Sequence, residues 1–141
     1  MSRGAEDVAQ AVGEIAAAWR AERAERQARR HLDRADFDAL RTAGLLAMPV
    51  PAEVGGLWGG AGGSARPLCE TYRSLAGGDP SVALVSSMHP AVIAFWLASP
   101  DPSQPDWERQ RSAVFASALA NEQWGTITSE PGSGGDIFRP P

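Results

Sequence analysis

The stretch from residue 80 to residue 98 constrains the fold more than any other part of the sequence. Pro90 stands in its middle and leaves the carbonyl of Ser86 without its helical donor, which predicts a kink. The length and the apolar pattern predict a helix without a polar face, and such a helix belongs in a protein interior. Its apolar residues are Val82, Leu84, Val85, Met88, Val92, Ile93, Phe95, Trp96 and Leu97.

Four further helices are predicted around this one. Residues 5–30 carry an apolar side chain every three or four positions, beginning with Val8 and Val12, which indicates one helical face. Cap residues and apolar spacing place the other three. They run from Asp33 or Asp36 to Gly44, from Ser64 to Gly77-Gly78, and over residues 105–120.

Arginines gather toward the end of the first predicted helix. Glu22 and Arg26, and likewise Glu25 and Arg29, stand four residues apart in the order that favours a helical ion pair. Because the acidic partners neutralise the arginines, we expect a solvated helix end here rather than a binding patch.

The segment Trp124-Gly125-Thr126-Ile127-Thr128 has the β-branched and aromatic content of a strand. A single strand has no partner for its backbone groups, so it requires more chain or another chain. The expected fold class is therefore all-α, a helical bundle with a β-strand stub at its C-terminal end.

The composition excludes several classes of function. All 13 basic residues are arginine, and a chain without lysine has neither a Walker A phosphate site nor Schiff-base chemistry. A net charge of −4 argues against a nucleic-acid partner. One cysteine and two distant histidines do not make a metal site. No apolar run reaches the roughly 18 residues of a membrane span, and without a signal peptide we expect a cytoplasmic location and no membrane partner.

Two motifs invite a specific interpretation. The run Gly60-Ala61-Gly62-Gly63-Ser64-Ala65 has the form of a dinucleotide-binding turn, but no strand precedes it and no acidic residue follows near position 85, so we interpret it as an interhelical loop. His89 is a potential proton-transfer group within the apolar stretch. Its position alone favours a hydrogen-bonded core histidine over a catalytic one. His31 is expected to be exposed, and Cys69 to be a structural thiol.

The segment from Ser129 to Asp136 is the strongest functional signal. Its alternating glycines allow consecutive backbone N–H groups to converge on an anion, and Ser133 adds a hydroxyl donor. A plain turn after a strand has the same composition, and the residues alone leave both interpretations open.

Three stretches resemble the N-terminal part of the acyl-CoA dehydrogenase family, and they follow one another in the family's order. The resemblance covers essentially the whole chain but about the first third of a family member. It implies an all-α N-terminal domain over residues 1–121 and the start of a middle β-domain, cut short, over residues 122–141. The three stretches are Phe37 to Gly56, the helix start Gly78-Asp79-Pro80-Ser81-Val82-Ala83, and Thr126 to Asp136, which is similar to the signature a-x-T-E-P-x-x-G-S-D.

The resemblance implies FAD as cofactor, an acyl-CoA or other small molecule as substrate, and a homo-oligomer. The implied reaction is α,β-dehydrogenation of the thioester, with hydride transfer to the flavin. Thr126 and Thr128 would contact the flavin ring, and Ser129 keeps the hydroxyl of the family's usual threonine. Gly135 replaces a pyrophosphate-binding serine, so Ser133 or the Gly135 N–H would substitute for it. No residue matches the family's catalytic base, which is expected beyond residue 141.

Two other interpretations stay open. Flavin-dependent monooxygenases of the same fold place a histidine on the helix equivalent to 80–98, and Ser87-Met88-His89-Pro90-Ala91-Val92 is similar to that pattern, which would make His89 catalytic. Glu130-Pro131-Gly132 follows the dehydrogenase signature better. The third interpretation is a non-catalytic helical module that associates with a full-length paralogue.

Overall fold

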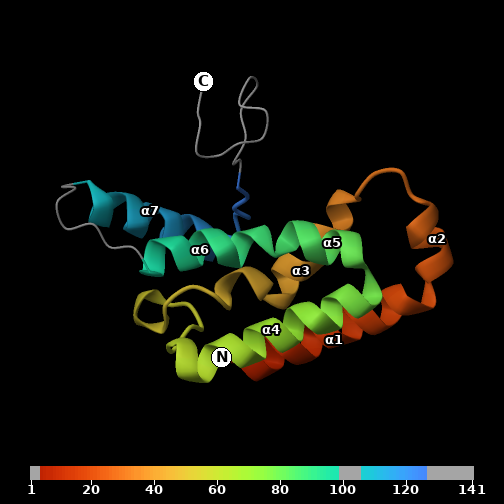
Figure 1. Cartoon of the computed structure of the whole chain (residues 1–141), viewed down its shortest axis with the longest axis horizontal. Helices are drawn as coiled ribbons and strands as arrows, with labels where there is room; N and C mark the ends of the chain where they lie inside the picture. The colour runs from red at the N-terminus through yellow and green to blue at the C-terminus, as the bar shows by residue number, and fades with distance from the viewer. Residues whose placement is uncertain (1–3, 99–105, 127–141) are drawn as a thin grey trace, which may run out of the picture.

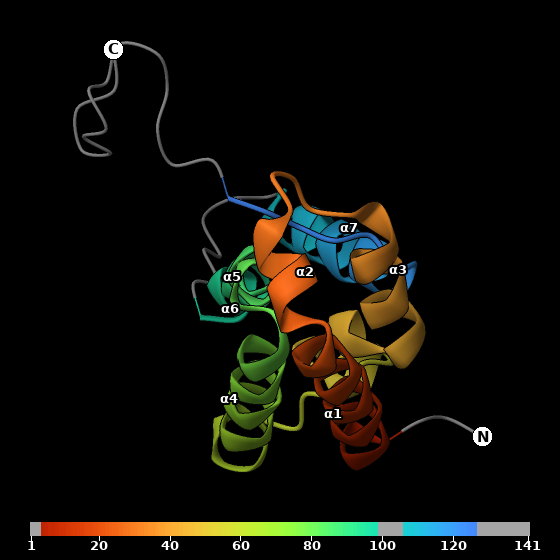
Figure 2. The ribbon, with the colours of Figure 1, turned by 90° about the vertical axis from the view of Figure 1, so that its right-hand side faces the viewer.

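The computed structural model describes residues 4–98 and 106–126, and within these ranges all of its regular elements are helices joined by loops. Helices α1 and α4 run side by side, while α5 and α6 follow each other end to end in a second layer beside α7 (Figure 1 and Figure 2). This arrangement confirms the all-α helical bundle. The elements are α1 Ala5–Ala21, α2 Arg23–Ala28, α3 Arg34–Ala43, the 3-10 turns η1 Leu45–Ala47 and η2 Ala52–Val54, α4 Ala61–Gly78, α5 Pro80–Ser86, α6 Met88–Ala98 and α7 Trp107–Leu119.

The pairing of α1 with α4 depends on a close approach of their backbones. A Cβ atom at Gly78 would lie 2.6 Å from the carbonyl oxygen of Ala16, so only glycine fits at this point. On α1, Val8, Val12 and Trp19 are buried, as their spacing predicts, and they belong to one hydrophobic cluster with Leu75 of α4. The glycines that end α4 therefore also set how closely the two helices pack.

Capping residues define most helix ends. The Asp33 side chain accepts from the backbone N–H of Ala35 at 2.9 Å, and Gly44 ends α3 with φ of 92°. The expected start of α4 at Ser64 is wrong, because the helix already begins at Ala61. The Ser64 hydroxyl instead accepts from the N–H of Gly59 at 2.9 Å and so closes the preceding loop.

The proline-rich connection before α4 folds back on itself. The N–H of Trp58 donates to the Val50 carbonyl at 2.8 Å, and the N–H of Ala52 donates to the Trp58 carbonyl at 2.9 Å. A Cβ atom at Gly56 would lie 2.0 Å from the Val50 carbonyl oxygen, so a side chain cannot be placed there. The connection is thus a compact, backbone-bonded loop.

The predicted helix over 80–98 is interrupted at Ser87, between α5 and α6. Pro90 has no N–H with which to satisfy the Ser86 carbonyl. The Tyr72 hydroxyl of α4 donates to that carbonyl instead, at 3.1 Å. The proline predicts a kink in one helix, and the structure instead divides the segment into two helices, with a side chain from a neighbouring helix as the donor to Ser86.

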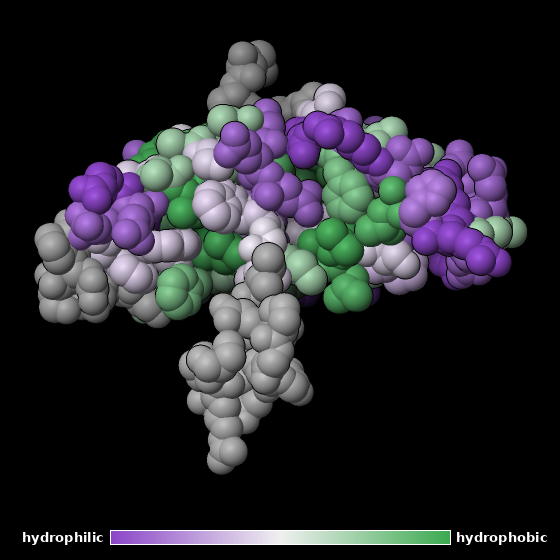
Figure 3. Space-filling model, turned by 90° about the horizontal axis from the view of Figure 1, so that it is seen from above, coloured by the Kyte–Doolittle hydropathy of each residue, from purple (hydrophilic) through white to green (hydrophobic). Residues whose placement is uncertain are grey.

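The expectation that this apolar segment is wholly buried is wrong. His89 and Ile93 are buried, but Leu84 is 68% exposed, Phe95 55% and Met88 38%. We call these three exposed side chains the α5–α6 apolar face. Seen from above, apolar side chains gather across the middle of the molecule and hydrophilic ones dominate its ends (Figure 3). One side of the segment supplies the core, and the other presents apolar surface to solvent.

The expectation that no apolar run reaches the length of a membrane span is wrong, because Pro80–Ala98 is long and apolar enough by length and composition, with a mean hydropathy of 1.6. The core helix of a soluble protein meets the same criterion. Within this segment the buried residues pack against other helices of the bundle.

Two hydrophobic clusters form the core. The first lies among α1, α3, η1, α4 and α5, and the second between α6, α7 and the loop at Val50. Leu119 and Trp124 pack on the second cluster. The buried members of the first are Val8, Val12, Trp19, Leu40, Ala43, Leu45, Met48, Leu75, Val82 and Ala83; those of the second are Val50, Ile93, Val114, Phe115 and Ala118.

The expected strand is not present in the part that the structure describes. Residues 122–126 form no strand, while Ile127 and Thr128 lie outside the described residues. The β-rich composition of this segment has no neighbouring strand to pair with among the described residues, and Trp124 packs against helices instead.

Candidate functional site

The imidazole of His89 lies fully buried where three segments meet. The backbone N–H of Trp124 donates to Nδ1 at 3.1 Å, and Nε2 lies 3.0 Å from the carbonyl oxygen of Leu46. Because Nδ1 accepts a hydrogen bond, Nε2 carries the proton and donates to Leu46. Both ring nitrogens are therefore engaged by backbone groups, and the ring is neutral.

Burial lowers the pKa of His89, and the hydrogen bond to the Leu46 carbonyl opposes this shift only in part. Protonation at Nδ1 would replace the acceptor that the Trp124 N–H requires with a second donor. The hydrogen bonds and the pKa thus agree on the neutral form.

Trp124 is held through its side chain as well as its backbone. Its indole Nε1–H donates to the Ser117 hydroxyl at 3.1 Å, and that hydroxyl also bonds to the Glu122 carboxylate. We call Leu46, His89, Ser117 and Trp124 the His89 centre. It joins η1, α6, α7 and the segment after α7, and so holds Trp124 against the bundle.

Of the predicted flavin-binding residues, the structure describes Thr126, which is exposed and follows Trp124 by two positions. Thr128, Ser129, Ser133 and Gly135 lie outside the described residues. Their cofactor-binding roles stay predictions. The hydrogen bonds of His89 are those of a core histidine, the interpretation that its position favours, and its catalytic role likewise stays a prediction.

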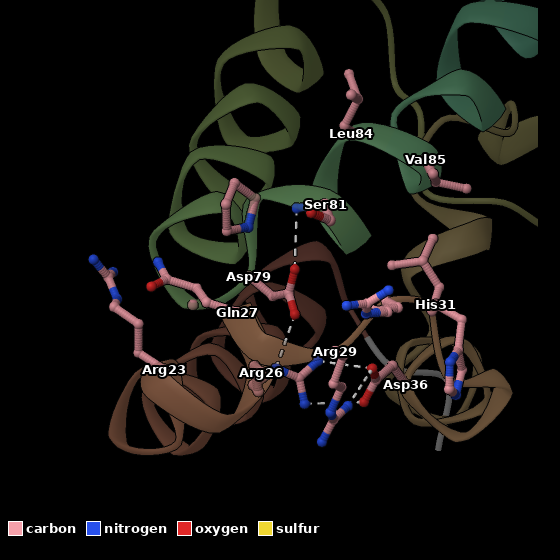
Figure 4. Close-up of a pocket in the computed structure, with 14 residues that line it drawn as sticks. Arg23, Arg26, Gln27, Arg29, His31, Asp36, Asp79, Ser81, Leu84 and Val85 are labelled. Atoms are coloured by element: carbon pink, nitrogen blue, oxygen red, sulfur yellow. Dashed lines mark hydrogen bonds and ion pairs between the residues drawn. The ribbon is translucent and has the colours of Figure 1, made fainter.

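A second buried polar group, Arg26, was not expected from the sequence. Its Nη1 and Nη2 donate to the two oxygens of Asp36 at 3.1 and 2.7 Å, and its Nε donates to Asp79 Oδ2 at 2.9 Å. Its guanidinium carbon lies 4.1 Å from the centre of a Trp19 ring, a cation–π contact. Figure 4 shows the guanidinium between the two carboxylates. We call Arg26, Asp36 and Asp79 the Arg26 centre.

Burial disfavours the charge on Arg26, but hydrogen bonds and charges from Asp36 and Asp79 outweigh that effect and raise its pKa. Arg29 adds a further contact to Asp36 at 3.3 Å. Asp79 has a second task, since its Oδ1 accepts from the N–H groups of Ser81 and Val82 at 3.0 and 3.1 Å and so caps α5.

The interpretation of residues 20–30 as a solvated helix end is therefore wrong for Arg26. Helix α1 ends before Glu22 and α2 begins after it. The Arg26 guanidinium on α2 is buried against Asp36 of α3 and Asp79 at the start of α5. One sequence signal was available: Arg26 stands seven residues after Trp19 and so continues the buried stripe of α1.

Other candidate groups make no site among the described residues. No group of three or more histidine, cysteine, aspartate or glutamate side chains there could hold a metal ion. His31 is exposed, as expected. Cys69, expected to be a structural thiol, is exposed on α4.

Comparisons with known proteins support the resemblance found in the sequence. Neither the curated proteins nor the solved structures contain a match to this chain. A family model described as the acyl-CoA dehydrogenase N-terminal domain matches residues 3–99, a range that holds α1 to α6 and includes the Arg26 centre and His89. This chain therefore belongs to the acyl-CoA dehydrogenase family, through that N-terminal domain.

Proposed function

We propose that this chain provides the helical N-terminal part of an FAD-dependent oxidoreductase that introduces an α,β double bond into an acyl-CoA thioester. The family match over residues 3–99 carries the proposal. The resemblance of residues 126–136 to the family's signature supports it. FAD, when bound, supplies the hydride acceptor.

The described residues do not by themselves make a flavin site. One of the five predicted contact positions, Thr126, falls among them, and its side chain is exposed. We therefore derive no reaction step from this chain and ask instead what its helices contribute to such an enzyme.

Two contributions follow from the geometry. The His89 centre orients the segment that leads from the bundle toward Thr126, because it binds both the backbone and the indole of Trp124. The α5–α6 apolar face offers a surface that an acyl chain or an adjoining domain would cover, which excludes water from the contact.

A domain exchange tests the proposal. Residues 1–126 of this chain replace the equivalent helical domain of an acyl-CoA dehydrogenase of known activity, and oxidation of acyl-CoA is followed by reduction of a dye. We expect measurable dehydrogenation. A chimaera that retains its flavin but oxidises no acyl-CoA of any chain length contradicts the proposal.

The isolated 141-residue chain gives a complementary result. We expect it to bind FAD weakly or not at all, because its described residues make no flavin site. Titration of FAD against the purified chain, followed by flavin fluorescence, measures this. Sub-micromolar affinity would overturn our expectation.

Two alternatives differ in what they require of this structure. A monooxygenase role for His89 needs a ring nitrogen that is available for chemistry, whereas both nitrogens here bind backbone groups. The alternative of a cofactor-free helical module draws on the exposed α5–α6 apolar face. A purified chain that is yellow, with a flavin spectrum, excludes that module.

A further inference from the structure

A pocket opens beside the Arg26 centre, with a cavity volume of about 420 Å³. It lies between α2, the loop that follows α2, and the start of α5 (Figure 4). Its volume is within the range of small-molecule sites in proteins. The family match and the sequence signature assign no role to it.

The pocket is positively charged although the chain as a whole carries a net charge of −4. Four arginines and two aspartates line it, which leaves two formal positive charges in excess with His31 uncounted. The charged lining residues are Arg23, Arg26, Arg29, Arg30, Asp36 and Asp79.

These arginines are not equally available to a ligand. Arg26 is fully occupied by its two aspartates, and Arg29 contacts Asp36. Arg23 donates to the Gly77 carbonyl at 2.8 Å and makes no ion pair with another described residue. Arg30 is exposed and has no ion pair with any residue that the structure describes. Arg30 is thus the guanidinium most free to bind an incoming anion.

An apolar surface completes the pocket. Leu32, Pro80, Leu84 and Val85 line it, and Leu84 is 68% exposed. In Figure 4, Leu84 and Val85 stand on the α5 side, across the pocket from Arg29 and Asp36. A cationic side and an apolar side face one cavity.

We propose that this pocket binds a small amphiphilic anion, with an oxyanion head at Arg30 and a short apolar tail against Leu84 and Val85. A guanidinium donates to a carboxylate or a phosphate through two parallel hydrogen bonds, so either head satisfies Arg30. The tail gains by removing the exposed Leu84 from water. The proposal does not depend on FAD or on the proposed reaction.

The test titrates the full 141-residue chain, by calorimetry at low salt, with acetate, butanoate, hexanoate and octanoate, and separately with inorganic phosphate. We expect saturable binding at one site, with affinity that rises along the carboxylate series by at most about fourfold per methylene. Phosphate has no apolar tail, so its affinity should be at most about ten times that of acetate. Absence of saturable binding in all arms overturns the proposal.

Matched variants separate the head from the tail. Arg30→Ala should weaken every carboxylate by about tenfold, because one charge-assisted contact is lost. Leu84→Ala should flatten the dependence on chain length and leave acetate unchanged. Arg66→Ala is the control, since Arg66 is exposed on α4, pairs with Glu70 and lies outside the pocket. Equal loss in Arg30→Ala and Arg66→Ala, or no loss in Arg30→Ala, contradicts the site.

Discussion

The two buried polar centres hold two successive helices, α5 and α6, in the bundle by different chemistry. The Arg26 centre holds the start of α5 through Asp79, with a charged guanidinium between two carboxylates. The His89 centre holds the start of α6, with a neutral ring between a backbone carbonyl and a backbone N–H. Removing the Arg26 side chain leaves buried charges without a partner, whereas removing the His89 side chain leaves buried backbone dipoles without a partner. The loss in the free energy of unfolding should therefore differ between the two centres.

The largest effect is expected from Arg26→Ala. It leaves Asp36 and Asp79 buried without their partner and removes the contact over Trp19, so we expect a loss of about 3–5 kcal/mol in the free energy of unfolding. Urea unfolding measures it. Arg30→Ala, an exposed arginine of the same segment, is the control and should stay within about 0.5 kcal/mol of the natural chain. If the Arg26→Ala and Arg30→Ala variants had equal free energies of unfolding, the buried Arg26 would stabilise the fold no more than an exposed arginine.

His89→Ala comes next, at about 2–4 kcal/mol, since it opens a cavity and leaves the Leu46 carbonyl and the Trp124 N–H without partners. We also expect faster hydrogen exchange at the Trp124 amide, which NMR resolves from the other amides. His31→Ala, on an exposed histidine, should change neither quantity. Unchanged exchange at Trp124 would show that His89 does not hold this segment.

The pH dependence of stability separates the centres further. Burial lowers the pKa of His89 below its ordinary value of 6.5, so the unfolded chain binds a proton more readily than the folded one. Stability should therefore fall as the pH drops below about 6.5 and recover above it, with a slope of at most about 1.4 kcal/mol per pH unit. Unfolding curves from about pH 7.5 to about pH 5, roughly one unit above and roughly 1.5 units below the ordinary histidine pKa, measure it.

His89→Gln is the control for that pH dependence. A glutamine amide can donate and accept as the neutral ring does, but it does not titrate. We expect the free energy of unfolding to depend less on pH in this variant near pH 6, about half a unit below the ordinary pKa of histidine. A slope that persists unchanged assigns the pH dependence to other groups.

The smallest effect concerns the position between the two centres. Tyr72→Phe removes the donor to the Ser86 carbonyl and should cost about 1 kcal/mol. Burial raises the pKa of Tyr72, which keeps its hydroxyl protonated as a donor. Pro90→Ala in the Tyr72→Phe chain restores a backbone N–H for Ser86 and should recover part of the loss. Urea unfolding of the single and double variants tests this. If the two changes in the free energy of unfolding simply added, the N–H restored by Pro90→Ala would not replace the Tyr72 hydroxyl as the donor to Ser86.

Local chemistry explains which parts of the fold could be predicted. Asp33, Gly44 and Asp79 act within one helical turn of their own position, so the sequence indicates them directly. The interruption before α6 follows from one missing N–H at Pro90. Ser64 has the residue type of a helix cap and so predicts too late a start for α4. Its hydroxyl bonds to the preceding loop instead.

The rest depended on distant contacts. Arg26 meets Asp36 and Asp79 from 10 and 53 positions away, and no local pattern shows that they converge. A histidine in an apolar segment indicates a special role for His89, but the sequence does not indicate its partners Leu46 and Trp124, which lie 43 and 35 positions away. Hydropathy likewise identified the apolar segment without showing which of its sides the bundle covers.

Asp79 uses one carboxylate oxygen for two amides of the helix that it caps and the other oxygen for a distant arginine, which couples two separate parts of the chain. Oδ1 holds the first-turn amides of α5, and Oδ2 holds Arg26 of α2. When α2 detaches, the carboxylate loses the cation that fixes its orientation, and the first turn of α5 loosens with it. We therefore expect helix α2 and the first turn of α5 to open together as one cooperative unit.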